Sequence, residues 1–95
     1  AGTIASRANA AIGEARSAIV QAEARLKEAR ASVERAKPLK QSGYLSESTF
    51  DQRESAARTA EAQLTAARED LRDQRARAEE AEQRAEDQRG RAERL

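Results

Sequence analysis

The sequence predicts an all-α fold, a two-helix antiparallel coiled-coil hairpin. The composition is the first reason: of 95 residues, 37% are charged and 38% are hydrophobic, much of the latter alanine, which is typical of long helices and leaves little for a globular core. Apolar residues also recur with a seven-residue period in two long segments. Finally, one short stretch between them, "RAKPLKQSGYLSESTFDQRE" at 35–54, holds the only proline, tyrosine and phenylalanine.

The first helix is predicted over about residues 4–42. Two apolar series with a spacing of seven run along it: Ala5, Ile12, Ile19, Leu26 and Val33, and Ala8, Ala15, Ala22, Ala29 and Ala36. Neighbouring positions are mostly Glu, Arg, Gln, Ser or Ala, so the helix carries one narrow apolar seam. A mean hydropathy of −0.95 is also compatible with disorder, but a disordered chain does not keep such a period.

The tip is predicted at 43–46. Gly43 suits a helix C-terminal stop because glycine adopts the left-handed conformation at little steric cost. Ser46 suits the N-cap of the next helix, and Leu45 before it is placed to pack on the residue four positions into that helix. So short a connection makes the two helices antiparallel neighbours. Pro38, which lacks an amide donor, is expected to loosen the last turn or to end the first helix early.

The second helix is predicted over about residues 47–94. Its series are Phe50, Ala57, Leu64, Leu71, Ala78, Ala85 and Ala92, and Ala60, Ala67, Ala81 and Leu95, with Arg53, Gln74 and Gln88 as exceptions. A turn near residue 44 places Leu26 opposite 60–67 and leaves residues beyond about 85 without a partner. The chain is therefore expected to be one hairpin domain, 1–95, within a larger protein. The charged stretch from Arg72 onward is interpreted as a solvated helical face.

Several classes of function are excluded by composition. The chain has no cysteine and no histidine, which removes thiol nucleophiles, imidazole bases and most transition-metal sites. We therefore predict no catalytic residue, no cofactor, no metal and no enzyme activity. A net charge of +1 without a basic, aromatic-rich stripe argues against a nucleic-acid partner. The longest run of large apolar residues is Ile19-Val20, so any membrane anchor or export signal is expected outside this sequence.

The tip is predicted to expose apolar side chains. Arg35 and Leu39 are four residues apart on one stripe that belongs to neither seam series, so both should face outward. Four apolar side chains, Leu39, Tyr44, Leu45 and Phe50, are placed at the end of a two-helix rod that has no third element to cover them, so at least some of them should be exposed. The alternative is that these four side chains merely plug the end of the hairpin.

The spacing of Arg35, Leu39 and Ser46 in "RAKPLKQSGYLS", followed by "ESTFDQ", resembles the hairpin tip of periplasmic adaptor proteins. These adaptors, also called membrane fusion proteins, serve tripartite efflux pumps and type I secretion systems. The resemblance is specific over about residues 33–52 and implies that the three residues, flanked by Tyr44 and Leu45, contact a TolC-type outer-membrane channel.

The resemblance also implies a role for the parent protein. It would be anchored to the inner membrane of a Gram-negative bacterium, with the hairpin in the periplasm, and would link the channel to an inner-membrane transporter through domains absent here. Several copies would form a homo-oligomeric ring. The pump class, whether proton-driven or ATP-driven, and the transported substrate stay open. The alternative function is a structural coiled coil that spaces or dimerises other domains, with the tip only a turn.

Overall fold

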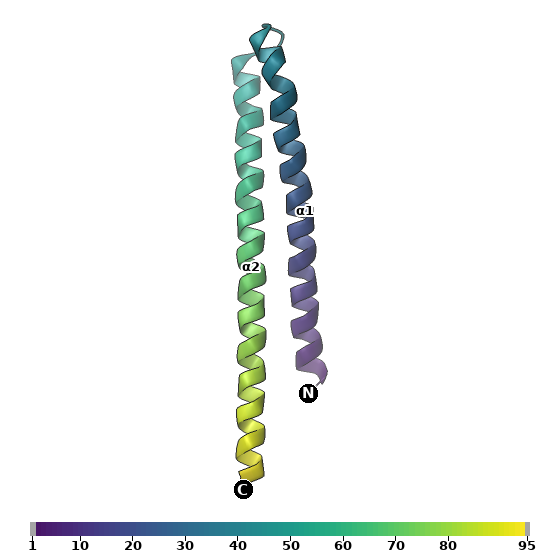
Figure 1. Ribbon diagram of the computed structural model, residues 1–95, viewed down its shortest axis with the longest axis vertical. Helices are drawn as coiled ribbons and strands as arrows, with labels where there is room; N and C mark the ends of the chain where they lie inside the picture. The colour runs from purple at the N-terminus through teal and green to yellow at the C-terminus, as the bar shows by residue number, and fades with distance from the viewer. Residues whose placement is uncertain (1, 95) are drawn as a thin grey trace.

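Two long helices form an antiparallel hairpin (Figure 1). The computed structural model describes residues 2–94, and the side chains of 5–94. Helix α1 runs from Gly2 to Gln41 and helix α2 from Glu47 to Arg94. The molecule is a thin rod with extents of 79 × 15 × 13 Å. The predicted two-helix antiparallel hairpin is confirmed.

The core is the narrow seam between the two helices. Every buried hydrophobic residue belongs to one of the predicted seven-residue series: Ala15, Ala22, Leu26, Ala36, Phe50, Ala60 and Leu64. Leu26 and Leu64 lie in one core cluster, and Ala67 packs against it, as the predicted register requires. Ala5 and Ala92 belong to the series but are exposed because they lie near the open end of the rod. Leu95 lies outside the described residues.

The alanine-rich seam brings little burial energy. A fully buried Leu or Phe side chain contributes about 1.5–3 kcal/mol, and among residues 5–94 the large buried residues are only Leu26, Leu64 and Phe50. Where the structure describes side chains, one ion pair joins the helices, between the Arg30 guanidinium and Glu61 Oε1 at 3.8 Å, with both side chains 61% exposed. An exposed pair contributes at most about 1 kcal/mol, so the hairpin depends on a few large side chains in its middle and near its closed end.

The two helices differ in length, and the difference appears at the open end. Figure 1 shows the C-terminal turns of α2 continuing past the N-terminal end of α1, as the register predicts. Neither helix, over the described residues, combines the length and the apolarity that a membrane span requires.

The chain reverses at Gly43, which has a φ of 81°. The Gly43 amide donates to the Lys40 carbonyl at 3.1 Å, and the Tyr44 amide donates to the Leu39 carbonyl at 2.9 Å. This pair of bonds is the Schellman motif, in which a left-handed residue satisfies the last carbonyls of a helix. The predicted helix stop at Gly43 is thereby confirmed.

Helix α1 continues through Pro38 to Gln41, so the expected early end of the helix does not occur. The reason lies in the bonds that follow the proline. The Pro38 carbonyl accepts hydrogen bonds from the Ser42 amide at 3.0 Å and from the Ser42 hydroxyl at 2.5 Å. These two bonds hold the last turn although the proline itself lacks an amide donor.

Ser46 begins the second helix. Its hydroxyl oxygen accepts from the Thr49 amide at 3.1 Å, and its carbonyl accepts from the Phe50 amide at 3.1 Å. The first bond satisfies one of the amides that a helix N-terminus leaves without a partner, so the predicted N-cap is confirmed.

Substituting alanine at two glycines should change stability in opposite directions. Gly13 is exposed inside α1, and an added Cβ there meets nothing within 4 Å. Gly13→Ala should raise the free energy of unfolding by about 1 kcal/mol through helix propensity. Gly43→Ala should lower it by about 1–2 kcal/mol, because a Cβ is strained at a φ of 81°. Urea unfolding followed by circular dichroism measures both, and equal effects would contradict the reversal geometry.

Removing the N-cap should weaken α2 at its start. Ser46→Ala should lower the free energy of unfolding by about 1 kcal/mol, because the Thr49 amide loses its acceptor. Ser48→Ala is the matched control, since Ser48 is exposed in the first turn of α2 and its substitution removes no capping bond. Thermal unfolding of both variants should show the loss for Ser46 alone.

Candidate functional site

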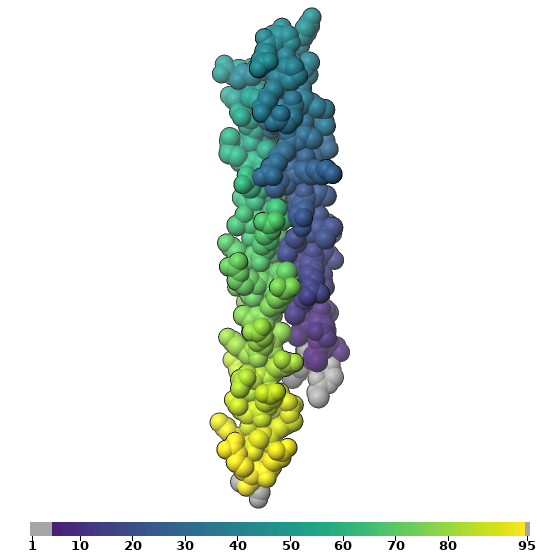
Figure 2. All heavy atoms as spheres, viewed as in Figure 1, coloured from purple at the N-terminus to yellow at the C-terminus, as the bar shows by residue number. Residues whose placement is uncertain are grey.

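The predicted docking residues gather at the closed end of the rod, the teal end in Figures 1 and 2. Leu39 is 43% exposed and Tyr44 is 84% exposed. Arg35 and Ser46 are exposed as well, and Leu45 is half-buried. We call these five residues the tip. Within residues 5–94 the only other large hydrophobic side chain with comparable exposure is Val20, at 66%, far along α1.

The underside of the tip is closed by other residues. Phe50 is 7% exposed and Ala36 is 0% exposed, so these two fill the end of the seam. The Lys40 ammonium lies 4.5 Å from the centre of the Phe50 ring, in a cation–π contact. Phe50 therefore plugs the hairpin end, as the alternative interpretation expected of it, whereas Leu39 and Tyr44 are left uncovered.

Arg35 is already engaged in an ion pair. Its guanidinium donates to Glu28 Oε1 at 2.9 Å, and the two residues are seven apart on the same helix. The side chain thus runs along α1 toward the open end of the rod. Both side chains are mostly exposed, at 62% and 73%, so the pair is weak and easily exchanged for another carboxylate or carbonyl. A guanidinium has five N–H donors, which leaves others free for a partner.

The Ser46 hydroxyl has less freedom than an ordinary surface serine. Its oxygen accepts from the Thr49 amide at 3.1 Å, and its hydrogen is donated to the Thr49 Oγ1 at 2.8 Å. A hydroxyl has one donor and two acceptor positions, so only one acceptor position remains. Ser46 is therefore suited to receive a single hydrogen bond from a partner while it caps α2.

The sequence analysis did not predict a role for three residues that contact the tip or the side chain below it: Glu28, Lys40 and Thr49. Each acts on a tip residue or on the side chain below it. The spacing of Glu28 and Arg35 is a heptad, and two residues at the same heptad position lie on one stripe of the helix. That spacing was the signal for this pair, whereas the position of Lys40 over Phe50 depends on how the two helices meet.

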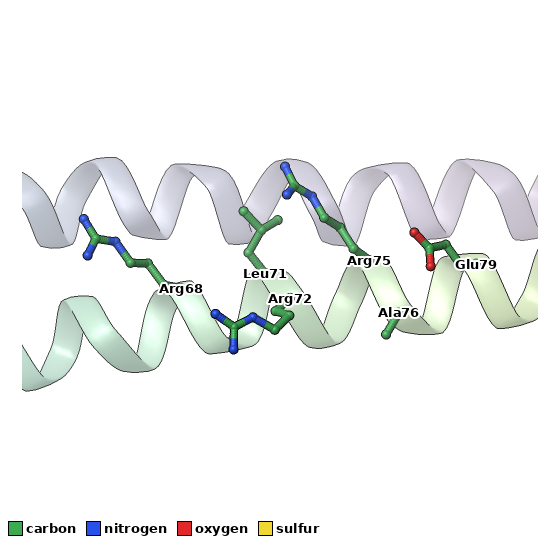
Figure 3. A pocket seen from close by; sticks show the side chains of 6 residues that line it. All are labelled: Arg68, Leu71, Arg72, Arg75, Ala76 and Glu79. Carbon is green, nitrogen blue, oxygen red and sulfur yellow. The ribbon is translucent and has the colours of Figure 1, made fainter.

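Two open grooves lie along the described part of the rod. One groove of about 380 Å³ lies beside Leu71 (Figure 3), and another of about 490 Å³ lies beside Val33. Neither includes a residue of the tip. Over the part of the chain that the structure describes, no cluster of acidic side chains is arranged to hold a metal ion.

Comparison with known proteins gives one match. The family model described as the alpha-helical hairpin domain of RND MFP, the membrane fusion proteins of RND transport systems, matches residues 11–74. No curated protein and no solved structure matches the chain. The matched residues include the whole tip and most of the seam, and they make up more than half of the chain. RND membrane fusion proteins are transport-associated adaptors of the Gram-negative periplasm, and this chain belongs to their family of α-helical hairpin domains.

Proposed function

We propose that this hairpin docks by its tip onto a TolC-type outer-membrane channel. The observation that carries the proposal is the exposure of Leu39, at 43%, and Tyr44, at 84%, at the end of a rod whose sides are mostly charged or small. An apolar patch that the chain's own fold leaves open is typical of a protein–protein contact. The matched adaptor family supports a partner in the outer membrane.

Each tip residue has a distinct role in this proposal. Leu39 fills an apolar notch between channel helices, with Tyr44 and Leu45 extending the apolar contact. Arg35 exchanges Glu28 for a carboxylate or carbonyl of the channel and provides a planar, multidentate donor. Ser46 accepts one hydrogen bond through its remaining lone pair.

The parent protein would link this channel to an inner-membrane pump. Several hairpins, arranged as a homo-oligomeric ring in the periplasm, would present their tips together to the channel. The matched family favours a pump of the RND class over the ATP-driven transporters of type I secretion. The role is mechanical and recognitional, and the proposal assigns no catalytic step to the hairpin.

A structural spacer is the competing function, and it differs in which residues matter. A spacer depends on seam residues such as Leu26 and Leu64, which are 6% exposed each. It gives no reason for Leu39 to stay uncovered. Loss of partner binding without loss of helical structure therefore separates the two functions.

Leu39→Asp should abolish association with a purified TolC-type channel while circular dichroism remains helical. A carboxylate cannot enter an apolar notch without a large desolvation penalty, whereas at this partly exposed position it does not disturb the seam. The measurement is a pull-down with the channel. Val20→Asp is the matched control, because Val20 is also exposed, at 66%, but lies far from the tip. Retained binding by the Leu39 variant would refute the docking role.

A further inference from the structure

The guanidinium of Arg35 is held against the side of α1 by a carboxylate two turns away. Its Nη2 donates to Glu28 Oε1 at 2.9 Å. Seven residues of helix span about 10.5 Å along the axis, so both side chains have to extend toward each other to meet. Helix side chains lean toward the N-terminus, which directs Arg35 away from the closed end of the rod. In the free hairpin its guanidinium therefore lies away from the surface that Leu39 and Tyr44 expose.

Arg35 has no shorter ion pair available on its own helix. A helical arginine pairs most readily with a carboxylate three or four residues away. The four such positions around Arg35 carry no carboxylate: they are Ala31, Ser32, Pro38 and Leu39. Glu34, the carboxylate next to it in the sequence, is paired with a lysine at 2.7 Å. The extended contact with Glu28 is thus the one that Arg35 makes.

This ion pair is exposed and can be exchanged. The Arg35 and Glu28 side chains are 62% and 73% exposed. An exposed pair shifts an equilibrium by no more than about fivefold. The contact with Glu28 is a single hydrogen bond, and a guanidinium has five N–H donors. A partner that offers two acceptors in one plane would therefore exchange one hydrogen bond for two.

We propose that Glu28 competes with the docking partner for Arg35, and that this competition lowers the affinity of the tip. The inference rests on the docking function proposed above. A hairpin whose Arg35 is paired with Glu28 has to break that contact before the guanidinium reaches the partner. The apparent dissociation constant rises accordingly, because only the hairpins with a released Arg35 are ready to make the full contact.

A positioning role for Glu28 is the competing interpretation. In that role Glu28 would hold Arg35 in the conformation that the partner binds, and the pair would survive docking. The direction of the side chain argues against it, because the contact with Glu28 draws the guanidinium along α1 and away from Leu39. The two roles predict opposite effects when Glu28 is removed.

The affinity of the hairpin for a purified TolC-type channel, measured by surface plasmon resonance, tests the competition. Glu28→Gln keeps the length of the side chain and removes its charge, and it should tighten binding roughly two- to fivefold. Glu28→Asp keeps the charge but shortens the reach, and it should tighten binding to a smaller extent. Unchanged or weaker binding by Glu28→Gln overturns the proposal.

The matched control is Glu23→Gln, which changes the net charge equally on the same helix. Glu23 is exposed, and within residues 5–94 it takes part in no ion pair. Its substitution should leave the affinity unchanged. Equal tightening by both substitutions would show a general effect of net charge and would contradict the competition.

A double-mutant cycle shows whether the effect passes through Arg35. Arg35→Gln should weaken docking, and adding Glu28→Gln should then change nothing, because no guanidinium remains to be released. Tightening that persists without Arg35 contradicts the proposal. The gain from Glu28→Gln alone should also shrink near 1 M salt, where the Debye length is about 3 Å.

Nuclear magnetic resonance of the hairpin alone tests the ion pair without a channel. A hydrogen bond from Nη2 to a carboxylate slows rotation about the Cζ–Nε bond of an arginine. Glu28→Gln should therefore speed this rotation at Arg35. Arg25 is the internal control, since it is exposed and is in no ion pair among the described side chains. Equal rotation rates at Arg35 in the native hairpin and the variant overturn the proposal.

The outcomes separate this inference from the docking function. If the native hairpin does not bind the channel, or if Arg35→Gln binds as tightly as the native hairpin, the docking proposal is wrong at that point and the competition is wrong with it. If Leu39→Asp and Arg35→Gln weaken binding but Glu28→Gln does not tighten it, docking stands and only the competition is wrong. Circular dichroism checks that each variant remains helical.

Discussion

The left-handed conformation of Gly43 reverses the chain between α1 and α2, and this reversal forms the tip. With a φ of 81°, this residue lets the Gly43 and Tyr44 amides turn back to the last carbonyls of α1. A residue with a side chain would be strained in that conformation. The Ser46 cap then starts α2 within a few residues. So tight a reversal leaves Leu39 and Tyr44 at the outer surface, with no chain available to cover them.

The alanine-rich seam affects both the width of the rod and its stability. Small side chains in the seam allow the helices to lie close together, and the molecule is a thin rod with extents of 79 × 15 × 13 Å. They also limit hydrophobic burial, so the few large buried residues, Leu26, Leu64 and Phe50, carry much of the stability. A rod this thin has no room for an enclosed site. The partner contact that we propose lies at the end of the rod, where Leu39 and Tyr44 are exposed.

The sequence predicted the fold well because heptad periodicity and local capping are both short-range signals. Leu26 and Leu64 were placed in the seam and opposite each other from spacing alone. The expectation that Pro38 ends α1 early was wrong. The amide and the hydroxyl of Ser42 both donate to the Pro38 carbonyl, and these two bonds hold the last turn of the helix. The engagement of Arg35 by Glu28 depends on side-chain conformation, which spacing indicates only weakly. The roles of the tip residues came from a family resemblance, and helix periodicity supplied only their outward orientation.

Photo-cross-linking from the tip tests the central claim most directly. A photoreactive phenylalanine analogue at Tyr44, which is 84% exposed, is compared with the same analogue at Val20, which is 66% exposed on the side of the rod. The hairpin is irradiated together with a purified TolC-type channel. The account predicts a covalent adduct with the channel from position 44 and none from position 20. An adduct from position 20 alone would show that the channel binds the side of the rod, and would contradict the account.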